Sequence, residues 1–168
     1  VQEMIAELKA ADTNDSAYRV SERIRFLQQP QNLGKRDAMA RGAKDWRTGK
    51  AFTRHTFEEL KPGFFPVFPL NWCKRHGVDP VLAESVMNYT PMGKRTEVVL
   101  DGFAPNRYLP RVQSKSIMED AQFDEVLASH EMNLEYLRAS QPREFLADRR
   151  HRFLGIVEYA LGKPVIRD

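Results

Sequence analysis

Residues 64–109 read FFPVFPLNWCKRHGVDPVLAESVMNYTPMGKRTEVVLDGFAPNRYL, and this stretch decides the fold because it holds most of the densest apolar runs of the chain. Pro66 and Pro69 interrupt its apolar start, and a proline removes the backbone donor that a helix interior needs. We therefore expect residues 64–69 to form a buried extended segment or an edge strand. The rest of the chain is expected to pack around this stretch as helices.

Behind the extended start, the stretch alternates short helices with turn residues. Residues 71–77 predict one or two helical turns that end at Gly77, because glycine tolerates the left-handed conformation that closes a helix. Asp79 and Pro80 predict the cap and first turn of a short helix over Val81–Met87. Further along, we expect residues 88–92 to be extended and residues 93–97 to form a basic turn. Gly102 and Pro105 should interrupt regular secondary structure over residues 102–105.

The flanking regions carry mostly helical patterns. Residues 1–60 are expected to be a helical lead-in, in which residues 35–51 form an exposed helix or a partly mobile segment because they are basic and weakly apolar. Residues 52–60 should lead into a short helix, and residues 110–116 read as a polar, basic connector. Residues 117–139 predict one bent helix or two. The last helix should start at Pro142 and end at Gly162, with one apolar stripe.

These patterns predict a mainly α (α+β) fold, in which a helical domain carries a small extended or ββα-like insert at about residues 64–100. A length of 168 residues suits a single domain, 1–168, divided into the lead-in 1–60, the central segment 64–109 and the C-terminal helices 117–162. The chain begins with Val1, and its opening lacks the basic start and apolar core of a signal peptide. We interpret it as a C-terminal fragment of a longer chain, or as a processed chain.

Composition narrows the functional classes. The chain is 42% hydrophobic and 29% charged, and no apolar run approaches the length of a membrane span, so we expect no membrane contact. The single cysteine, Cys73, excludes a disulfide framework and a cysteine-built zinc site, which favours a cytoplasmic location. A net charge of +3 permits an anionic partner without demanding one. The sequence leaves the oligomeric state open.

General catalytic motifs do not identify an enzyme. The four histidines, 55, 76, 130 and 151, show no spacing typical of a metal pair, so we predict no metal ligands among them. The sequence also lacks a phosphate-binding glycine loop and the Gly-x-Ser-x-Gly turn of serine hydrolases. Each histidine is therefore interpreted as structural or exposed.

Several short pieces do follow the order and spacing of one nuclease family. They are Val67-Phe68-Pro69 with Trp72 and Lys74–Val78, then Ser85–Met92, then Ala104–Leu109, and in the tail Leu127–His130, Glu144–Leu146, Arg149, Leu154 and Ala160–Gly162. Over residues 65–164 the chain thus resembles the C-terminal domain of the GmrSD-type modification-dependent restriction endonucleases. In that family a His-Asn-His (HNH) DNase domain follows a ParB-like nucleotide-binding domain. The resemblance covers about 100 of the 168 residues.

The resemblance also implies what is lost. In an HNH nuclease the first loop supplies an Asp or His metal ligand and a His general base, and a later His or Asn completes a divalent-metal site. Phe65 and Pro66 occupy the positions of the ligand and the base, and neither can bind metal or accept a proton. Asn88 matches the middle asparagine of the family. It is either a relict of the catalytic site or a residue that only bonds to the backbone of residues 65–69. Glu97 stands near the position that the terminal asparagine has in the family.

We therefore expect a degenerate HNH-like domain of a bacterial defence protein, DNA-associated or regulatory and without hydrolytic activity. It would need no cofactor, and its partners would be DNA and an N-terminal domain of the same chain. One alternative is an active DNA endonuclease that uses Mg or Mn, with His55, His76 or Glu97 in a rearranged site. The other alternative is a protein-interaction domain.

Basic residues flank the relict site in sequence. If they converge on one cleft, they would attract phosphates through counterion release, although a solvated surface explains them equally well. We interpret the aromatic residues of the stretch, Phe64, Phe65, Phe68 and Trp72, as core and not as platforms for stacked bases. The candidate DNA-binding residues are Lys74, Arg75, Lys94, Arg95, Arg107, Arg111 and Lys115.

Overall fold

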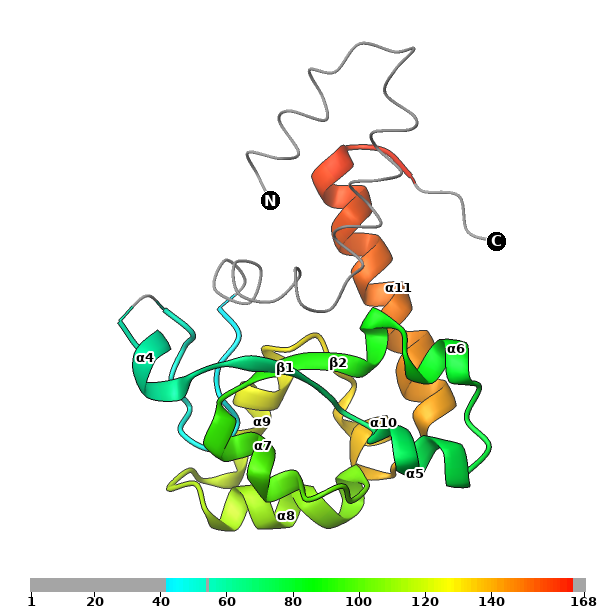
Figure 1. The fold of residues 1–168 in the computed structure, drawn as a ribbon. Coiled ribbons are helices and arrows are strands. Elements are labelled where there is room, and N and C mark those ends of the chain that lie inside the picture. The colour runs from blue at the N-terminus through cyan, green and yellow to red at the C-terminus, as the bar shows by residue number, and fades with distance from the viewer. Residues whose placement is uncertain (1–41, 54, 165–168) are drawn as a thin grey trace.

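The computed structural model describes residues 42–53 and 55–164, which are mainly helical with one small sheet (Figure 1). The predicted fold class is therefore confirmed, whereas the helices expected within residues 1–41 lie outside the described residues. The strands are β1 (Gly63–Pro66) and β2 (Tyr89–Met92). The helices are α4 (Phe57–Leu60), α5 (Leu70–Arg75), α6 (Pro80–Ala83), the 3-10 helix η1 (Val86–Asn88), α7 (Lys94–Leu100), α8 (Pro105–Ser114), α9 (Asp120–Ala128), α10 (Leu134–Arg138) and α11 (Pro142–Leu161).

The two strands and α7 form a strand–strand–helix unit at the centre of the molecule. β1 and β2 pair antiparallel, with Phe65 opposite Thr90 and Pro66 opposite Tyr89. The connection between the strands holds α5, α6 and η1, and β2 continues through Gly93 directly into α7. The extended segment expected at the start of the central stretch is thus one strand of this sheet.

Local signals placed the ends of the short helices in the connection correctly. α5 stops just before Gly77, which has a φ of +65°. The side chain of Asp79 accepts a hydrogen bond from the backbone nitrogen of Val81 at 2.8 Å, as a cap for α6. However, α6 ends at Ala83 instead of continuing to Met87, because the carbonyl of Ala83 accepts a hydrogen bond from the side chain of Asn88 at 2.8 Å.

Two predictions of irregular structure were wrong. Residues 94–97, expected in a basic turn, open α7, whose start is held by Asp45: its Oδ1 accepts from the backbone nitrogen of Gly93 at 2.8 Å. Residues 110–114, expected in a connector, belong to α8, which contains Pro110 in its interior. Burial of Tyr108 and Val112 on either side of that proline outweighs the missing backbone donor.

Of the two alternatives expected for residues 35–51, an exposed helix or a partly mobile segment, the exposed helix is wrong for the described part, residues 42–51. This part has no helix, and Lys44 and Ala51 form an isolated antiparallel bridge. Trp46 has no exposed surface, and its ring stacks on that of Tyr108 with centroids 6.1 Å apart. The basic character of the segment concealed a core residue whose contacts come from distant helices.

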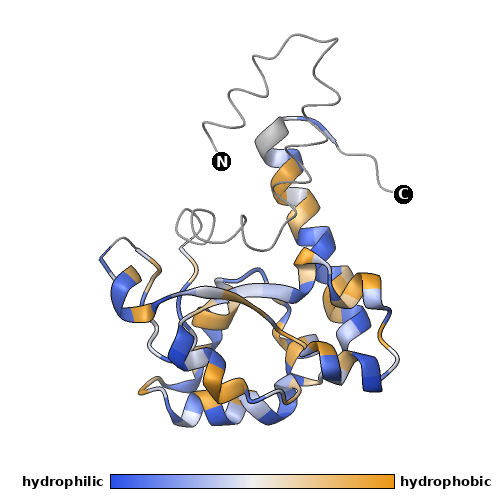
Figure 2. Ribbon diagram, in the orientation of Figure 1, coloured by the Kyte–Doolittle hydropathy of each residue, from blue (hydrophilic) through white to orange (hydrophobic). Residues whose placement is uncertain are grey.

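The C-terminal helices follow the predicted pattern in part. Residues 117–139 form two helices, α9 and α10, and α11 ends at Gly162 with a φ of +65°. Phe145 is fully buried, but Val157 further along the same stripe is 42% exposed, so the expected apolar stripe is core only in its first half. Figures 1 and 2 show the second half of α11 extending beyond the rest of the fold, with hydrophobic residues on it.

The main core lies between the sheet and the helices α8 to α11. Its largest fully buried side chains include Phe68, Phe123 and Phe145, and the ring centroids of Phe68 and Phe145 are 5.3 Å apart. Of the four aromatic residues expected in the core, Phe68 is fully buried, whereas Phe64, Phe65 and Trp72 are half-buried. Among the described helices, none combines the length and apolar character that a membrane crossing requires.

Candidate nucleic-acid interface

The side chain of Asn88 holds the loop that follows β1. Its Oδ1 accepts a hydrogen bond from the backbone nitrogen of Phe68, and its Nδ2 donates to the carbonyl oxygens of Phe68 and Ala83, all at 2.8 to 2.9 Å. The residue is fully buried. All of its strong hydrogen-bonding contacts therefore go to the backbone, which corresponds to the second of the two readings of Asn88, a structural bond to the loop.

Phe65 and Pro66 lie in the strand that leads into this loop. The ring of Phe65 covers Gly63, where an added Cβ would lie 2.9 Å from the ring, and the Nζ of Lys94 lies 5.5 Å from the ring centroid. Lys94 also pairs with Glu97, at 3.1 Å. Near Phe65 the structure thus places a cation, Lys94, whose partner carboxylate is that of Glu97.

Arg149, on α11, clamps the two residues that flank Asn88. Its Nη1 donates to the carbonyl oxygens of Met87 and Tyr89 at 2.8 and 3.0 Å, and its Nη2 donates to the carbonyl of His130 at 3.1 Å. The guanidinium is buried among carbonyls, and burial lowers the pKa of Arg149 to about 9. Sequence reasoning included Arg149 in the resemblance but assigned it no role, because its acceptors are backbone atoms far away in the chain.

His130 ties the same region to the segment around Lys44. Its Nε2 lies 2.7 Å from the carbonyl of Lys44, which can only accept, so Nε2 carries the proton and Nδ1 accepts from the hydroxyl of Thr90 at 2.7 Å. Burial, together with the charge of Arg149, lowers the pKa of His130 to about 4. His130 is therefore a neutral, structural histidine at neutral pH.

The residues proposed for a rearranged catalytic site do not converge. His55 is exposed just before α4, and His76 is exposed at the end of α5, stacked on Trp72. α4 and α5 lie at opposite ends of the molecule in Figure 1. Glu97 lies on α7, in its pair with Lys94. Within residues 42–53 and 55–164, no three side chains of His, Cys, Asp or Glu are grouped so that they could hold a metal ion.

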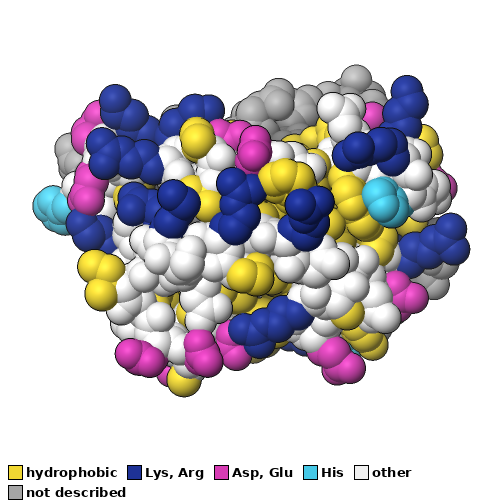
Figure 3. Space-filling view, turned by 90° about the horizontal axis from the view of Figure 1, so that it is seen from below, with side chains coloured by type: hydrophobic (Ala, Val, Ile, Leu, Met, Phe, Trp, Pro, Cys, Tyr) yellow, Lys and Arg dark blue, Asp and Glu magenta, His cyan; other side chains and the backbone are white. Residues whose placement is uncertain are grey.

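The candidate DNA-binding residues, unlike these candidate catalytic residues, lie on or next to helices that share one side of the fold. These helices are α5, α7 and α8, on the lower side in Figure 1. Viewed from that side, the surface shows a row of Lys and Arg side chains running across the face (Figure 3). Every Lys and Arg of these three helices is exposed. Together with the residue that follows α8, they form what we call the basic face: Lys74, Arg75, Lys94, Arg95, Arg107, Arg111 and Lys115.

Two residues of this face are paired with acids. Arg111 lies 3.7 Å from Asp101, and Lys94 pairs with Glu97. Arg107 lies over the half-buried ring of Phe103, with its guanidinium carbon 4.4 Å from the centroid, and Arg111 approaches the same ring at 5.2 Å. A ring that holds two guanidinium groups leaves their polar edges available to an anion.

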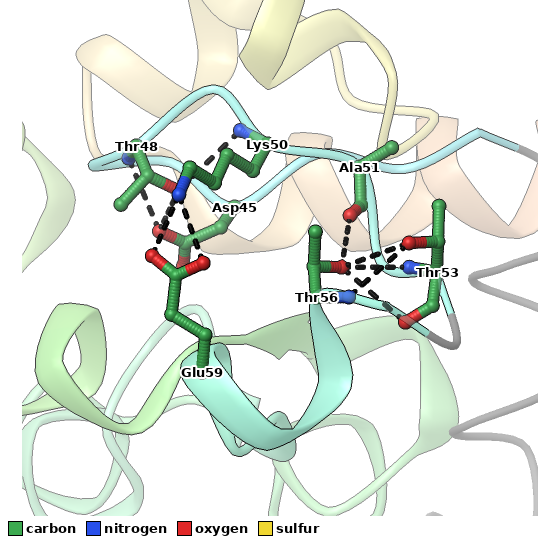
Figure 4. Close-up of polar contacts among 7 residues, drawn as sticks. All are labelled: Asp45, Thr48, Lys50, Ala51, Thr53, Thr56 and Glu59. Carbon is green, nitrogen blue, oxygen red and sulfur yellow. Dashed lines mark hydrogen bonds and ion pairs between the residues drawn. The ribbon is translucent and has the colours of Figure 1, made fainter.

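At the start of α7 the surface is hollowed into a small pocket with a volume of about 30 Å³. The loop after Asp45, α4 and α7 enclose it, and its polar lining includes Asp45, Arg47, Glu59 and Arg95. Lys50 reaches from the loop to Glu59 on α4, and Thr48 bonds to Asp45 (Figure 4). Thr56 fastens the start of α4 to the carbonyl of Ala51 at 2.6 Å. Sequence reasoning did not single out this pocket.

Comparisons of the chain with protein families, with curated proteins and with solved structures each find no match.

Proposed function

We propose that the chain is a DNA-associated module built on an HNH-like strand–strand–helix scaffold that has lost its hydrolytic side chains. The basic face carries this proposal. Exposed Lys and Arg side chains gathered on one side of a small domain attract the phosphate backbone and release its counterions. The ring of Phe103 under Arg107 and Arg111 orients two of these side chains at the surface.

The geometry around Asn88 supports the scaffold part of the proposal. In the family that the chain resembles, the amide of the middle asparagine helps to hold the catalytic loop, and Asn88 bonds to the loop after β1 at Phe68. Phe65 and Pro66 stand where the ligand and the base would be. A module of this kind binds DNA or regulates a partner domain without cleaving the DNA.

The wider setting rests on the resemblance alone. In the GmrSD-type family the HNH domain follows a ParB-like nucleotide-binding domain, so we propose that this module works beside such a domain in a bacterial defence protein of the cytoplasm. The module would then place the neighbouring domain on DNA. It would not supply the hydrolytic step.

Salt-dependent binding to duplex DNA tests the proposal. Lys74 and Arg107 form no ion pair with any described residue. The double substitution Lys74→Ala plus Arg107→Ala should weaken binding and reduce the slope of log K against log salt by about 1.8, if each contacts one phosphate. The matched control is Arg150→Ala plus Lys163→Ala, which removes two exposed charges on and just after α11. Equal effects of the two pairs would contradict a basic face that binds DNA.

Plasmid cleavage with Mg or Mn separates this module from an active nuclease. We expect no nicking by the wild-type chain, and the variant His55→Ala plus His76→Ala serves to recognise a contaminating nuclease. Nicking that disappears in this variant would establish the relocated active site instead. Absence of both nicking and DNA binding would favour a protein-interaction domain.

A further inference from the structure

The pocket at the start of α7 contains two acids, Asp45 and Glu59, and the oxygens of both already accept hydrogen bonds. Asp45 has no exposed surface and accepts four hydrogen bonds, from the backbone and hydroxyl of Thr48, the backbone of Gly93 and the hydroxyl of Thr96. Both oxygens of Glu59 accept from Nζ of Lys50, at 2.6 and 2.8 Å. Lys50 balances the charge of Glu59, whereas the donors to Asp45 are all uncharged, so Asp45 keeps its negative charge and the two arginines outnumber it.

The side chains of the two arginines in the pocket, in contrast to the acids, lack hydrogen-bonding partners among the described residues. The Nε of Arg47 is buried and has no hydrogen-bond partner. No described residue forms a hydrogen bond or an ion pair with the side chain of Arg47 or of Arg95, although both residues line the same pocket. Two like charges that face one small cavity repel each other, and a buried donor without an acceptor is costly. An anion in the pocket would relieve both costs.

We propose that Arg47 and Arg95 form a binding site for one backbone phosphate of a nucleic acid. A planar guanidinium donates two parallel hydrogen bonds to phosphate oxygens, which suits a pair of arginines better than a pair of lysines. The pocket is small, with a volume of about 30 Å³, and both arginines belong to its lining.

The position of Arg95 favours a nucleic acid over an isolated phosphate group. Arg95 follows Lys94 at the start of α7 and belongs to the basic face as well as to the pocket. A strand that follows the basic face would therefore reach the pocket with one of its phosphates. This inference rests on the proposed function. It adds Arg47, a residue outside the basic face, to the residues that would contact the phosphates of the strand.

Binding of a short duplex DNA to the full chain tests the site, with two matched pairs of variants. Arg47→Ala should lower the affinity about tenfold and the salt slope by about 1, whereas Arg150→Ala, which removes an exposed charge from α11, should change either only slightly. Glu59→Gln should raise the affinity more than Glu58→Gln, because Glu58 is exposed on the same helix but does not line the pocket. Arg47→Lys, which keeps the charge, should fall between wild type and Arg47→Ala.

A second measurement detects the binding of phosphate at Arg47 directly. The Nε–H signal of Arg47 in a ¹⁵N spectrum should shift on titration with inorganic phosphate, and Arg95→Ala should weaken that response. If the duplex binds and Arg47→Ala behaves like Arg150→Ala, the pocket proposal is overturned while the DNA-binding proposal stands. If the signal responds to phosphate or a phosphopeptide but the duplex does not bind, the nucleic acid is the wrong ligand. If none of these binds, both proposals fail.

Discussion

Asn88 brackets the backbone of Phe68 from both sides, accepting from its nitrogen and donating to its carbonyl oxygen, each at 2.9 Å. A side-chain amide is the group that can do this, because it carries a donor and an acceptor side by side. The two residues are 20 positions apart in the chain. Their contact fixes the loop between β1 and α5 relative to the start of β2.

This contact predicts that Asn88→Ala destabilises the fold. The substitution leaves the nitrogen and carbonyl of Phe68, and the carbonyl of Ala83, without their buried partner, at a cost of about 3 kcal/mol in the free energy of unfolding. Urea denaturation followed by tryptophan fluorescence measures the loss. Asn71→Ala, at an exposed position on α5, is the control and should change stability by less than about 0.5 kcal/mol. Equal stability of the two variants would contradict a structural role for Asn88.

His130 predicts a loss of stability in acid. Its pKa is about 4 in the folded state and 6.5 in the unfolded chain, so the unfolded chain binds more protons between these values. Stability from this residue is fully present above pH 6.5 and decreases as the pH falls towards 4, by on the order of 3 kcal/mol.

Urea unfolding at a series of pH values between 4 and 7 measures this dependence. His130→Gln should reduce the slope in this window, whereas His76→Ala, at an exposed position, should retain it. A wild-type slope that survives His130→Gln would assign the acid sensitivity to other groups.

Arg149 predicts a difference between two neighbouring arginines. Arg149→Lys keeps the charge but cannot reach three carbonyl oxygens with a planar fork, so we expect a loss of about 2 to 3 kcal/mol. Arg150→Lys, at the next and exposed position, should be neutral. Thermal unfolding of both variants makes the comparison, and a neutral Arg149→Lys would show that charge alone is what the site requires.

Substitution of glycine by alanine should change the stability of the protein in opposite directions at two positions. A Cβ added at Gly155 or at Gly77 meets nothing within 4 Å. Gly155 lies inside α11, so Gly155→Ala should stabilise the helix by about 0.5 to 1 kcal/mol. Gly77 has a φ of +65°, so Gly77→Ala should destabilise the protein by about 1 kcal/mol despite the open space. Thermal unfolding and helix content by circular dichroism test the pair, and changes of the same sign would contradict the conformational explanation.

The candidate site was predictable where the chemistry of a residue is visible in the sequence. The basic residues of α5, α7 and α8 are exposed, as their charge requires. Arg47 and Arg149 received no role, because nothing in their local sequence distinguishes them from solvated arginines. What distinguishes them is a pocket in one case and three carbonyl oxygens in the other, and both are formed by segments distant in the chain.

The sequence by itself determined the elements whose ends depend on local backbone chemistry. Pro66 and Pro69 limit a strand, Asp79 caps α6, and Gly77 and Gly162 adopt the left-handed conformation after their helices. These are properties of one residue and its immediate neighbours, so they are readable without the fold.

Only the tertiary structure decided which polar segments become core or helix. Residues 42–51 appeared exposed, yet Trp46 is buried against Tyr108, and the start of α7 is held by the carboxylate of Asp45. Pro110 remains inside α8 because its neighbours are buried. In each case the deciding contact joins residues far apart in the chain, and its free energy exceeds the local preference that a sequence pattern records.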